Sequence, residues 1–367
     1  MKIIFYCDPY SASIGNFQHD VINIADGLRE LGVVFSSNVN YWDPEEGDYL
    51  FKFEPQLDPG PADVVIFNSC YLQNHESLPS FVGNRAGPFT VWVDSGDGQF
   101  TAFSNSEVQR CDLILKSHYS INQQYPRQTV PWAFGVSTRI MRHLASVSPW
   151  ILRDNVMIIN YRCNHPVRLD ADRLLTPIFE RHFKCDRRRD PYSQDGMESY
   201  DERCCRLSHG RHMPSTLRRM QANRYGFAFG GERGFREDLL DKCLGRLGIF
   251  ESVRQSRQIV YQWDSWRLWE SLLAGCVTFH LDFNKYGFRL PVMPTNGVHY
   301  LGVDLDNPEQ VDAVLGDEGT LAKVSEQARQ WALAHYSPKA VAQRLLRLLQ
   351  SRGVDVGALP GFQAAAD

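Results

Sequence analysis

Residues 258–281 read QIVYQWDSWRLWESLLAGCVTFHL, and the order of strand and helix in them indicates the fold class. Its first apolar run predicts a buried strand that ends at a polar turn, Asp264 and Ser265. Ser265 is a natural N-cap, so we expect a helix from about Ser265 to Ala274. The run CVTFHLD then predicts a second strand. Strand, helix and strand in succession indicate an α/β fold.

The same alternation extends in both directions along the chain. Near the N-terminus, KIIFYC predicts a buried strand, and apolar residues at spacings of three and four predict a helix over 17–31 that stops at Gly32. Three further strand-like runs follow, ADVVIFNSC, FTVWVDSGDG and CDLILKS, and VMIINY opens a second series at Val156. We therefore expect two doubly wound, Rossmann-like domains.

Domain boundaries follow from breaks in this rhythm. SVSPWILRDN separates the two series, so we expect an N-terminal domain over residues 1–148 and a C-terminal domain over 149–336. Residues 337–367 would form a further amphipathic helix and a flexible tail. The polar stretch from Cys185 to Ser215 has little apolar periodicity and is expected to be a long loop or insertion.

Composition excludes several classes of protein. The chain has 367 residues, of which 43% are hydrophobic and 22% charged, which indicates a folded globular protein. A net charge of -4, from 39 Lys and Arg against 43 Asp and Glu, argues against a dedicated nucleic-acid binder. Nine scattered cysteines and the lack of a signal peptide or spanning segment predict a cytoplasmic protein, with peripheral membrane contact left open.

Arg267 and Glu270 are the residues most suited to bind a nucleotide. They lie three apart, so they share one face of the predicted helix, close to an N-terminus whose free N–H groups favour phosphate. A guanidinium can bind diphosphate oxygens bidentately, and a carboxylate can accept two hydrogen bonds from a ribose diol. Asp264 and Ser265 lie in the turn beside them. The alternative is an ordinary ion pair within the helix.

These residues also carry a family resemblance. The string WRLWESLLAGCVTF, followed by YGF, PV and NGVHY, resembles the C-terminal signature of glycosyltransferases of the GT-B architecture, and SWRLWESLLAGC also resembles their exostosin-like branch. Retaining GT-B enzymes carry two Glu separated by seven residues. Glu270 matches the second, which holds the ribose, whereas Gln262 occupies the first position. Inverting and retaining chemistry both remain open.

The resemblance implies two domains that face each other across a cleft. The C-terminal domain would bind a UDP- or GDP-linked sugar, the N-terminal domain would bind a saccharide or other hydroxyl acceptor, and the final helix would cross back to the N-terminal domain. No cofactor and no metal ion are expected. Polysaccharide biosynthesis is the setting that the family favours.

The resemblance further implies basic residues near the donor diphosphate. The turn after VMIINY holds Arg162 and Arg168, and the loop after YGFAFGG offers Arg233 and Arg236 as competing candidates. Fixed cations there would stabilise the negative charge of the leaving nucleotide. Gly230, Gly231 and Gly234 resemble half of a phosphate loop, but a tight turn explains them equally well.

Acceptor activation is expected from the N-terminal domain. His19, at the start of the first helix, could deprotonate a hydroxyl, or it could simply pack. Asp94 and Asp97 follow a buried strand, at the sheet edge where α/β proteins bind ligands, and they could instead form a turn. Their spacing is not the Asp-x-Asp of metal-dependent transferases.

Other classes of function stay open from the sequence. Because Gln262 stands where retaining enzymes have a glutamate, a non-catalytic protein of GT-B shape that binds a ligand or acts as a scaffold remains an alternative. A dinucleotide-dependent oxidoreductase is disfavoured because DPYSASIGN contains only Gly15 and no G-x-G-x-x-G. A zinc site at Cys204, Cys205, His209 and His212 would lack the usual Cys-x2-Cys half.

Overall fold

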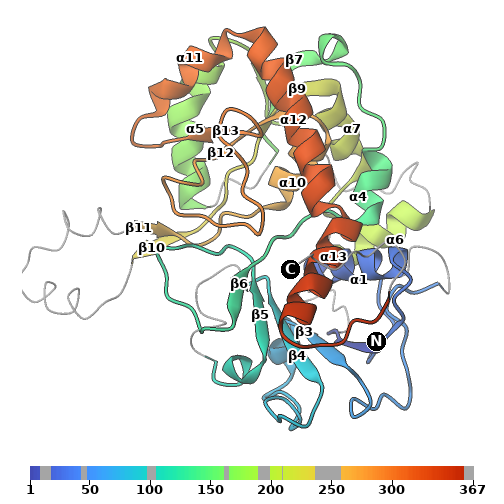
Figure 1. Ribbon diagram of the computed structural model, residues 1–367. Coiled ribbons are helices and arrows are strands. Elements are labelled where there is room, and N and C mark those ends of the chain that lie inside the picture. The colour runs from blue at the N-terminus through green and yellow to red at the C-terminus, as the bar shows by residue number, and fades with distance from the viewer. Residues whose placement is uncertain are drawn as a thin grey trace, which may run out of the picture.

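The computed structural model describes residues 1–8, 18–42, 48–96, 105–160, 165–188, 199–208, 210–235 and 258–358. They form two α/β lobes, the N-terminal one below and the C-terminal one above in Figure 1. Asp97, Arg162, His209 and Arg236 lie outside the described residues.

A six-stranded parallel sheet forms the centre of the N-terminal lobe, in the order β2-β1-β3-β4-β5-β6. The run VVIFN of β3 is buried along its whole length, as expected for a strand with helices or loops on both faces. The strands are β1 (Ile3–Tyr6), β2 (Phe35–Ser37), β3 (Val64–Asn68), β4 (Phe89–Asp94), β5 (Leu113–Lys116) and β6 (Thr129–Pro131).

The first helix of this lobe supports both the sheet and the end of the chain. Helix α1 (His19–Glu30) buries Val21, Ile24 and Leu28 in the lobe's core. Helix α13 (Pro338–Ser351) packs closely on α1, where the bare Gly27 lets the two backbones approach (Figure 1). Two short helical elements also lie in the described part of this lobe, α2 (Tyr71–Asn74) and the 3-10 turn η1 (Val108–Arg110).

The C-terminal lobe is built on a five-stranded parallel sheet, in the order β13-β12-β9-β7-β8. Its strands are β7 (Asp154–Ile158), β8 (Lys184–Asp186), β9 (Asn223–Phe227), β12 (Val277–Leu281) and β13 (Leu301–Val303). Its helical elements are α5 (Pro166–Phe179), α7 (Pro214–Ala222), α10 (Trp266–Leu273), η4 (Pro308–Val311), α11 (Asp312–Leu315) and α12 (Glu318–Tyr336). The expected arrangement of two doubly wound lobes is confirmed.

The segment between the lobes belongs largely to the C-terminal core. Helix α4 (Thr138–His143) and the turn η2 (Trp150–Leu152) lie in it. Ala133, Phe134 and Ile140 pack with the C-terminal lobe, whereas Trp132 packs with the N-terminal lobe. The chain therefore enters the C-terminal core at residue 133, and the first strand of that lobe begins at Asp154. The predicted boundary, between residues 148 and 149, lies between these two points.

Two sequence expectations need correction. The stretch from Cys185 to Ser215 is not one long loop, because it contains part of β8 and the helix α6 (Ser199–Leu207). Tyr200, Cys204 and Leu207 give α6 an apolar face that packs on the N-terminal core. The strand at 258–260 is also not part of the main sheet. As β11 (Gln258–Val260) it pairs antiparallel with β10 (Arg233–Phe235) in a separate two-stranded ribbon.

Within the described ranges, no helix combines the length and the apolar character that a membrane crossing requires.

Candidate functional site

The site is organised by the start of α10. Ser265 has an extended backbone, and its Oγ accepts a hydrogen bond of 3.3 Å from the N–H of Leu268, so Ser265 is the N-cap. Its partner in the turn, Asp264, is buried and accepts hydrogen bonds from Trp269 Nε1 (2.6 Å) and from the N–H of Phe134 (2.8 Å). Burial raises the pKa of Asp264 to about 7.

Residues from the N-terminal lobe hold this turn in place. The Nδ1 atom of His118, just beyond β5, accepts hydrogen bonds from the backbone N–H groups of Asp264 (2.9 Å) and Trp263 (3.2 Å). Because burial lowers the pKa of His118 well below its usual range, the ring is neutral and Nδ1 can accept. The entry to α10 is therefore fixed at the junction of the two lobes.

Glu270 is the centre of a buried charged network. Its side chain is fully buried, with Oε2 bonded to the guanidinium of Arg267 and Oε1 accepting from His212 Nδ1 at 2.7 Å. Burial alone would raise the pKa of Glu270, but the charge of Arg267 and the contact with His212 lower it to about 2. The ion pair that the sequence offered as an alternative is thus formed.

The partners of Glu270 are themselves anchored. Arg267 Nε donates to the carbonyl of Asn160, just beyond β7, at 2.9 Å. The buried Arg139 of α4 donates from NH1 to the carbonyl of His212 at 2.6 Å. Since Nδ1 of His212 faces a carboxylate, it carries the hydrogen.

His19 brings the N-terminal lobe into the same cluster. Its ring stacks on His212, with centroids 5.0 Å apart and an angle of 27° between the ring planes. It also forms a T-shaped contact with Trp266, with centroids 4.6 Å apart and an angle of 88°. Burial, together with the nearby His212 and Arg139, lowers the pKa of His19 well below its usual range. We call His19, His212, Trp266, Arg267 and Glu270 the interlobe cluster.

Asp94 lies at the carboxyl edge of the N-terminal sheet, near enough to Asp20 for the charges of the two side chains to interact. It is buried and forms an ion pair of 3.2 Å with Lys116, which is buried at the end of β5. Its Oδ1 also accepts from the N–H of Gly96 at 3.0 Å, the turn contact that the sequence allowed. Next to His19, Asp20 accepts from Asn68 Nδ2 at 3.0 Å, and burial raises the pKa of Asp20 to about 7.

The arginines predicted to bind the donor diphosphate, Arg168 and Arg233, contact groups outside the interlobe cluster. Arg168 on α5 donates to the carbonyl of Phe229 at 3.2 Å. Arg233 on β10 forms an ion pair of 2.8 Å with Asp170, which is also on α5. The structure brings His19, Arg267 and Glu270 together beside the turn of Asp264 and Ser265, and it does not bring Asp94 or Arg233 into that group.

Four residues of the site were missed by sequence reasoning, namely His118, Arg139, His212 and Asp20. His212 was considered only as a zinc ligand, yet it pairs with Glu270, while Cys204 packs in the N-terminal core. Asp20 carried no motif, and its only signal was its place beside His19 at a helix start. No group of three or more His, Cys, Asp or Glu side chains suited to a metal ion occurs among the described residues.

Comparisons with known proteins agree on the fold. No protein-family model matches the chain, and no curated protein sequence matches it. Among solved structures, an alpha-glucosyltransferase in complex with UDP superposes with a TM-score of 0.51 at 9% identity, covering 95% of this chain and 100% of its own. A glycosyltransferase from Rickettsia africae gives a TM-score of 0.50 at 12% identity, covering 96% and 99%. The chain has the fold of the GT-B glycosyltransferases.

Proposed function

We propose that the chain transfers a sugar from a nucleotide diphosphate to an acceptor hydroxyl, without a metal ion. The observation that carries the proposal is the interlobe cluster. It places a guanidinium at the start of a helix and an imidazole from the opposite lobe within one group of contacts. The UDP bound to the alpha-glucosyltransferase of similar fold supports UDP as the nucleotide.

Arg267 would bind the diphosphate. Its side chain is 25% exposed, in contrast to the fully buried Glu270, so part of the guanidinium is accessible to a ligand. Departure of the nucleotide concentrates negative charge on the diphosphate, and a cation held in advance by Glu270 and Asn160 stabilises that charge without reorganisation. Arg162, Arg168 and Arg233 remain proposed as further donor contacts.

Glu270 would act mainly by positioning Arg267 and His212. Both of its oxygens are engaged by these two residues, so a ribose diol would have to replace one of the bonds. Titration with UDP and 2′-deoxy-UDP separates the two roles. A preference for UDP that is lost in Glu270→Gln would show ribose binding, and equal affinities in the wild type would leave Glu270 as a positioning residue.

We propose that Asp20 activates the acceptor hydroxyl and that His19 assists it. Only His19 was already suggested by the sequence. A general base works best with a pKa near the working pH, and burial raises the pKa of Asp20 to about 7. His19 is neutral and can accept a hydrogen bond, but its lowered pKa makes it a weak base. Asp94 is tied to Lys116 and is the less suitable candidate, while Asp97 stays a prediction.

Calorimetric titration with UDP, GDP and NAD tests the donor site. We expect a nucleoside diphosphate to bind and Arg267→Gln to weaken it by about tenfold, because a charged hydrogen bond is lost. Arg173→Gln, which alters an exposed arginine of α5, is the matched control. Lack of affinity for both diphosphates would refute the proposal, and NAD preference would favour an oxidoreductase.

The second candidate function is a ligand-binding protein without transfer activity. Gln262 in place of a glutamate and the fully engaged Glu270 favour it. Incubation with a panel of nucleotide sugars and acceptor saccharides, with detection of released nucleotide, separates the two. Release that requires Asp20 supports the enzyme, and binding without release supports the binding protein.

A further inference from the structure

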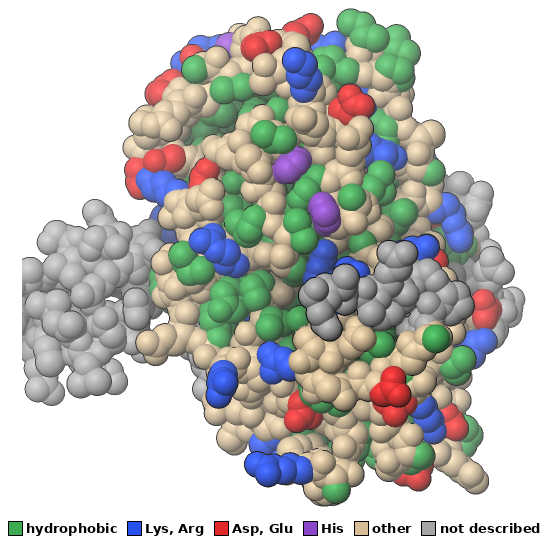
Figure 2. Space-filling model, in the orientation of Figure 1, with side chains coloured by type: hydrophobic (Ala, Val, Ile, Leu, Met, Phe, Trp, Pro, Cys, Tyr) green, Lys and Arg blue, Asp and Glu red, His purple; other side chains and the backbone are tan. Residues whose placement is uncertain are grey.

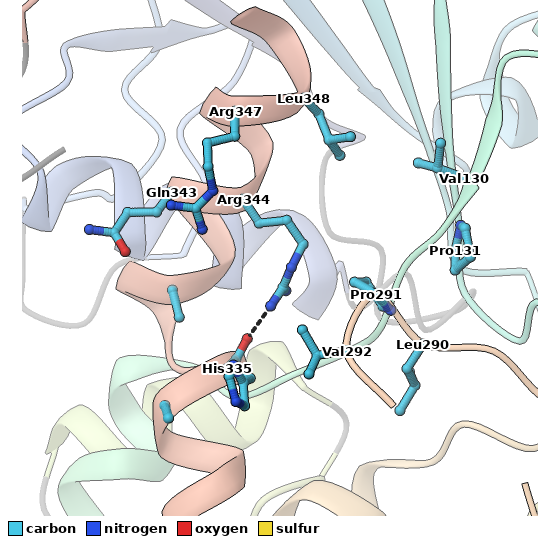
Figure 3. A pocket seen from close by; sticks show the side chains of 12 residues that line it. Val130, Pro131, Leu290, Pro291, Val292, His335, Gln343, Arg344, Arg347 and Leu348 are labelled. Atoms are coloured by element: carbon cyan, nitrogen blue, oxygen red, sulfur yellow. Dashed lines mark hydrogen bonds between the residues drawn. The ribbon is translucent and has the colours of Figure 1, made fainter. Parts of the chain in front are cut away.

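A cavity lies where three elements of the chain meet, and none of its lining residues belongs to the interlobe cluster. Its volume is about 430 Å³. Strand β6 of the N-terminal lobe, the loop at 290–292 of the C-terminal lobe and the corner between α12 and α13 surround it (Figure 3). The lining residues are Val130, Pro131, Leu290, Pro291, Val292, Ala334, His335, Ala340, Gln343, Arg344, Arg347 and Leu348.

Most of the wall is apolar, and part of it is held rigidly. The side chains of Val130, Pro131, Leu290 and Leu348 contribute aliphatic surface. The loop at Val292 is fixed because its N–H donates to the hydroxyl of Tyr336 (2.9 Å) and its carbonyl accepts from that hydroxyl (2.6 Å). A preformed apolar wall with a few polar groups is typical of a small-molecule site.

The polar groups of the cavity are mainly cationic. Arg344 extends from α13 toward the end of α12, where it donates to the carbonyl of His335 at 2.7 Å and lies 5.0 Å from the ring centroid of Tyr336 (Figure 3). Arg347 follows one turn later on the same helix and is exposed at the rim. Figure 2 shows basic and hydrophobic side chains next to one another where the lobes meet.

Within the part of the chain that the structure describes, these two arginines lack the acidic partners that other arginines have. Arg139 pairs with Asp201 at 3.2 Å and Arg224 with Glu318 at 2.6 Å, whereas neither Arg344 nor Arg347 forms an ion pair with any described residue. Burial lowers the pKa of Arg344, and the neighbouring Arg347 adds to this effect. A guanidinium that is largely removed from water and not neutralised by a carboxylate is stabilised by an anion.

We propose that this cavity binds a phosphate monoester that carries an apolar group. The phosphate would bridge Arg344 and Arg347, because a guanidinium fork matches phosphate oxygens, and the apolar group would lie against the wall formed by Pro131, Leu290 and Leu348. The same chemistry occurs in a soluble organic phosphate and in the headgroup region of an acidic lipid. The site does not depend on glycosyl transfer.

Calorimetry with phenyl phosphate, inorganic phosphate and benzyl alcohol tests the proposal. We expect phenyl phosphate to bind more tightly than either of the others, since only it uses both parts of the cavity. Arg347→Gln and Arg344→Lys should each weaken it by about tenfold, the latter because lysine keeps the charge but loses the fork. Lys339→Gln removes an exposed charge from the same helix outside the cavity and should leave the affinity unchanged.

Vesicles distinguish the two sources of the ligand. Cosedimentation with phosphatidylcholine vesicles containing phosphatidic acid, lost in Arg347→Gln, would identify a lipid. Binding of phenyl phosphate without cosedimentation would identify a soluble ligand. Thermal unfolding shows whether each variant still folds. The proposal is overturned if phenyl phosphate fails to bind at millimolar concentration, if inorganic phosphate binds equally well, or if the folded arginine variants bind it as the wild type does.

Discussion

Replacing Glu270 by glutamine should destabilise the protein far more than the loss of one surface charge. In the wild type, both carboxylate oxygens face donors, Arg267 on one side and His212 Nδ1 on the other. A glutamine amide keeps one oxygen for Arg267, but its NH2 group would then face His212, whose hydrogen would have to move from Nδ1 to Nε2. The partly buried guanidinium of Arg267 would also lose its counter-charge.

The pKa of Glu270 gives the size of this effect. Its fall from 4.5 to about 2 reflects the preference of the folded state for the ionised carboxylate. Each tenfold change in an acid constant corresponds to about 1.4 kcal/mol, so ionised Glu270 stabilises the fold by about 3 kcal/mol. Because the folded-state pKa is depressed, this stabilisation is complete above pH 4.5 and disappears as the pH falls toward 2.

Urea unfolding at pH 7, 5 and 4 measures this free energy. We expect Glu270→Gln to lose about 3 kcal/mol at pH 7 and the gap from the wild type to begin to narrow below pH 4.5. Glu30→Gln, at an exposed position of α1, should change the stability by less than about 0.5 kcal/mol. Equal stabilities of the two variants at pH 7 would show that the network does not stabilise the fold.

The remaining predictions concern the helices and the acidic groups. Ser265→Ala removes the N-cap of α10 and should cost about 1 kcal/mol in urea unfolding, whereas an unchanged midpoint would deny the cap. Gly27→Ala would drive a Cβ into the carbonyl oxygen of Pro338 and should cost about 1 to 3 kcal/mol. Gly316→Ala, with open space around it, should be nearly neutral in thermal unfolding. The raised pKa of Asp20 makes the folded chain bind more protons than the unfolded chain between pH 4 and 7. The wild type should therefore lose about 2 kcal/mol of stability relative to Asp20→Asn from pH 5 to pH 8. A constant difference in stability between the two proteins would show that Asp20 does not titrate in this range.

Much of the fold could be predicted because the signals are local. Continuous apolar runs such as VVIFN indicate strands buried on both faces, and the N-cap and periodicity around Ser265 place α10 within a residue of its bounds. Helix α6 was missed because its apolar face depends on Cys204, which carries little weight in a stretch otherwise rich in charge. The ribbon of β10 and β11 was missed because a short apolar run does not reveal its pairing partner.

The candidate site was harder to predict because its contacts are not local. Arg267 and Glu270 lie one helical turn apart, so their pairing was visible in the sequence. His212 lies 58 residues before Glu270, and His19 belongs to the other lobe, so no spacing rule connects them. Asp264 also accepts from Phe134, which lies 130 residues earlier in the chain, so its burial could not be read from local sequence.

The docking of α13 on α1 has a consequence for the order of folding during synthesis. Val341, Leu345 and Leu349 complete the core of the first lobe, although the ribosome makes them after nearly the whole second lobe. Until they emerge, the surface of α1 that they cover is exposed to water and to other nascent chains. On a ribosome stalled near residue 330, the N-terminal lobe should therefore bind chaperones, whether or not the C-terminal lobe has folded.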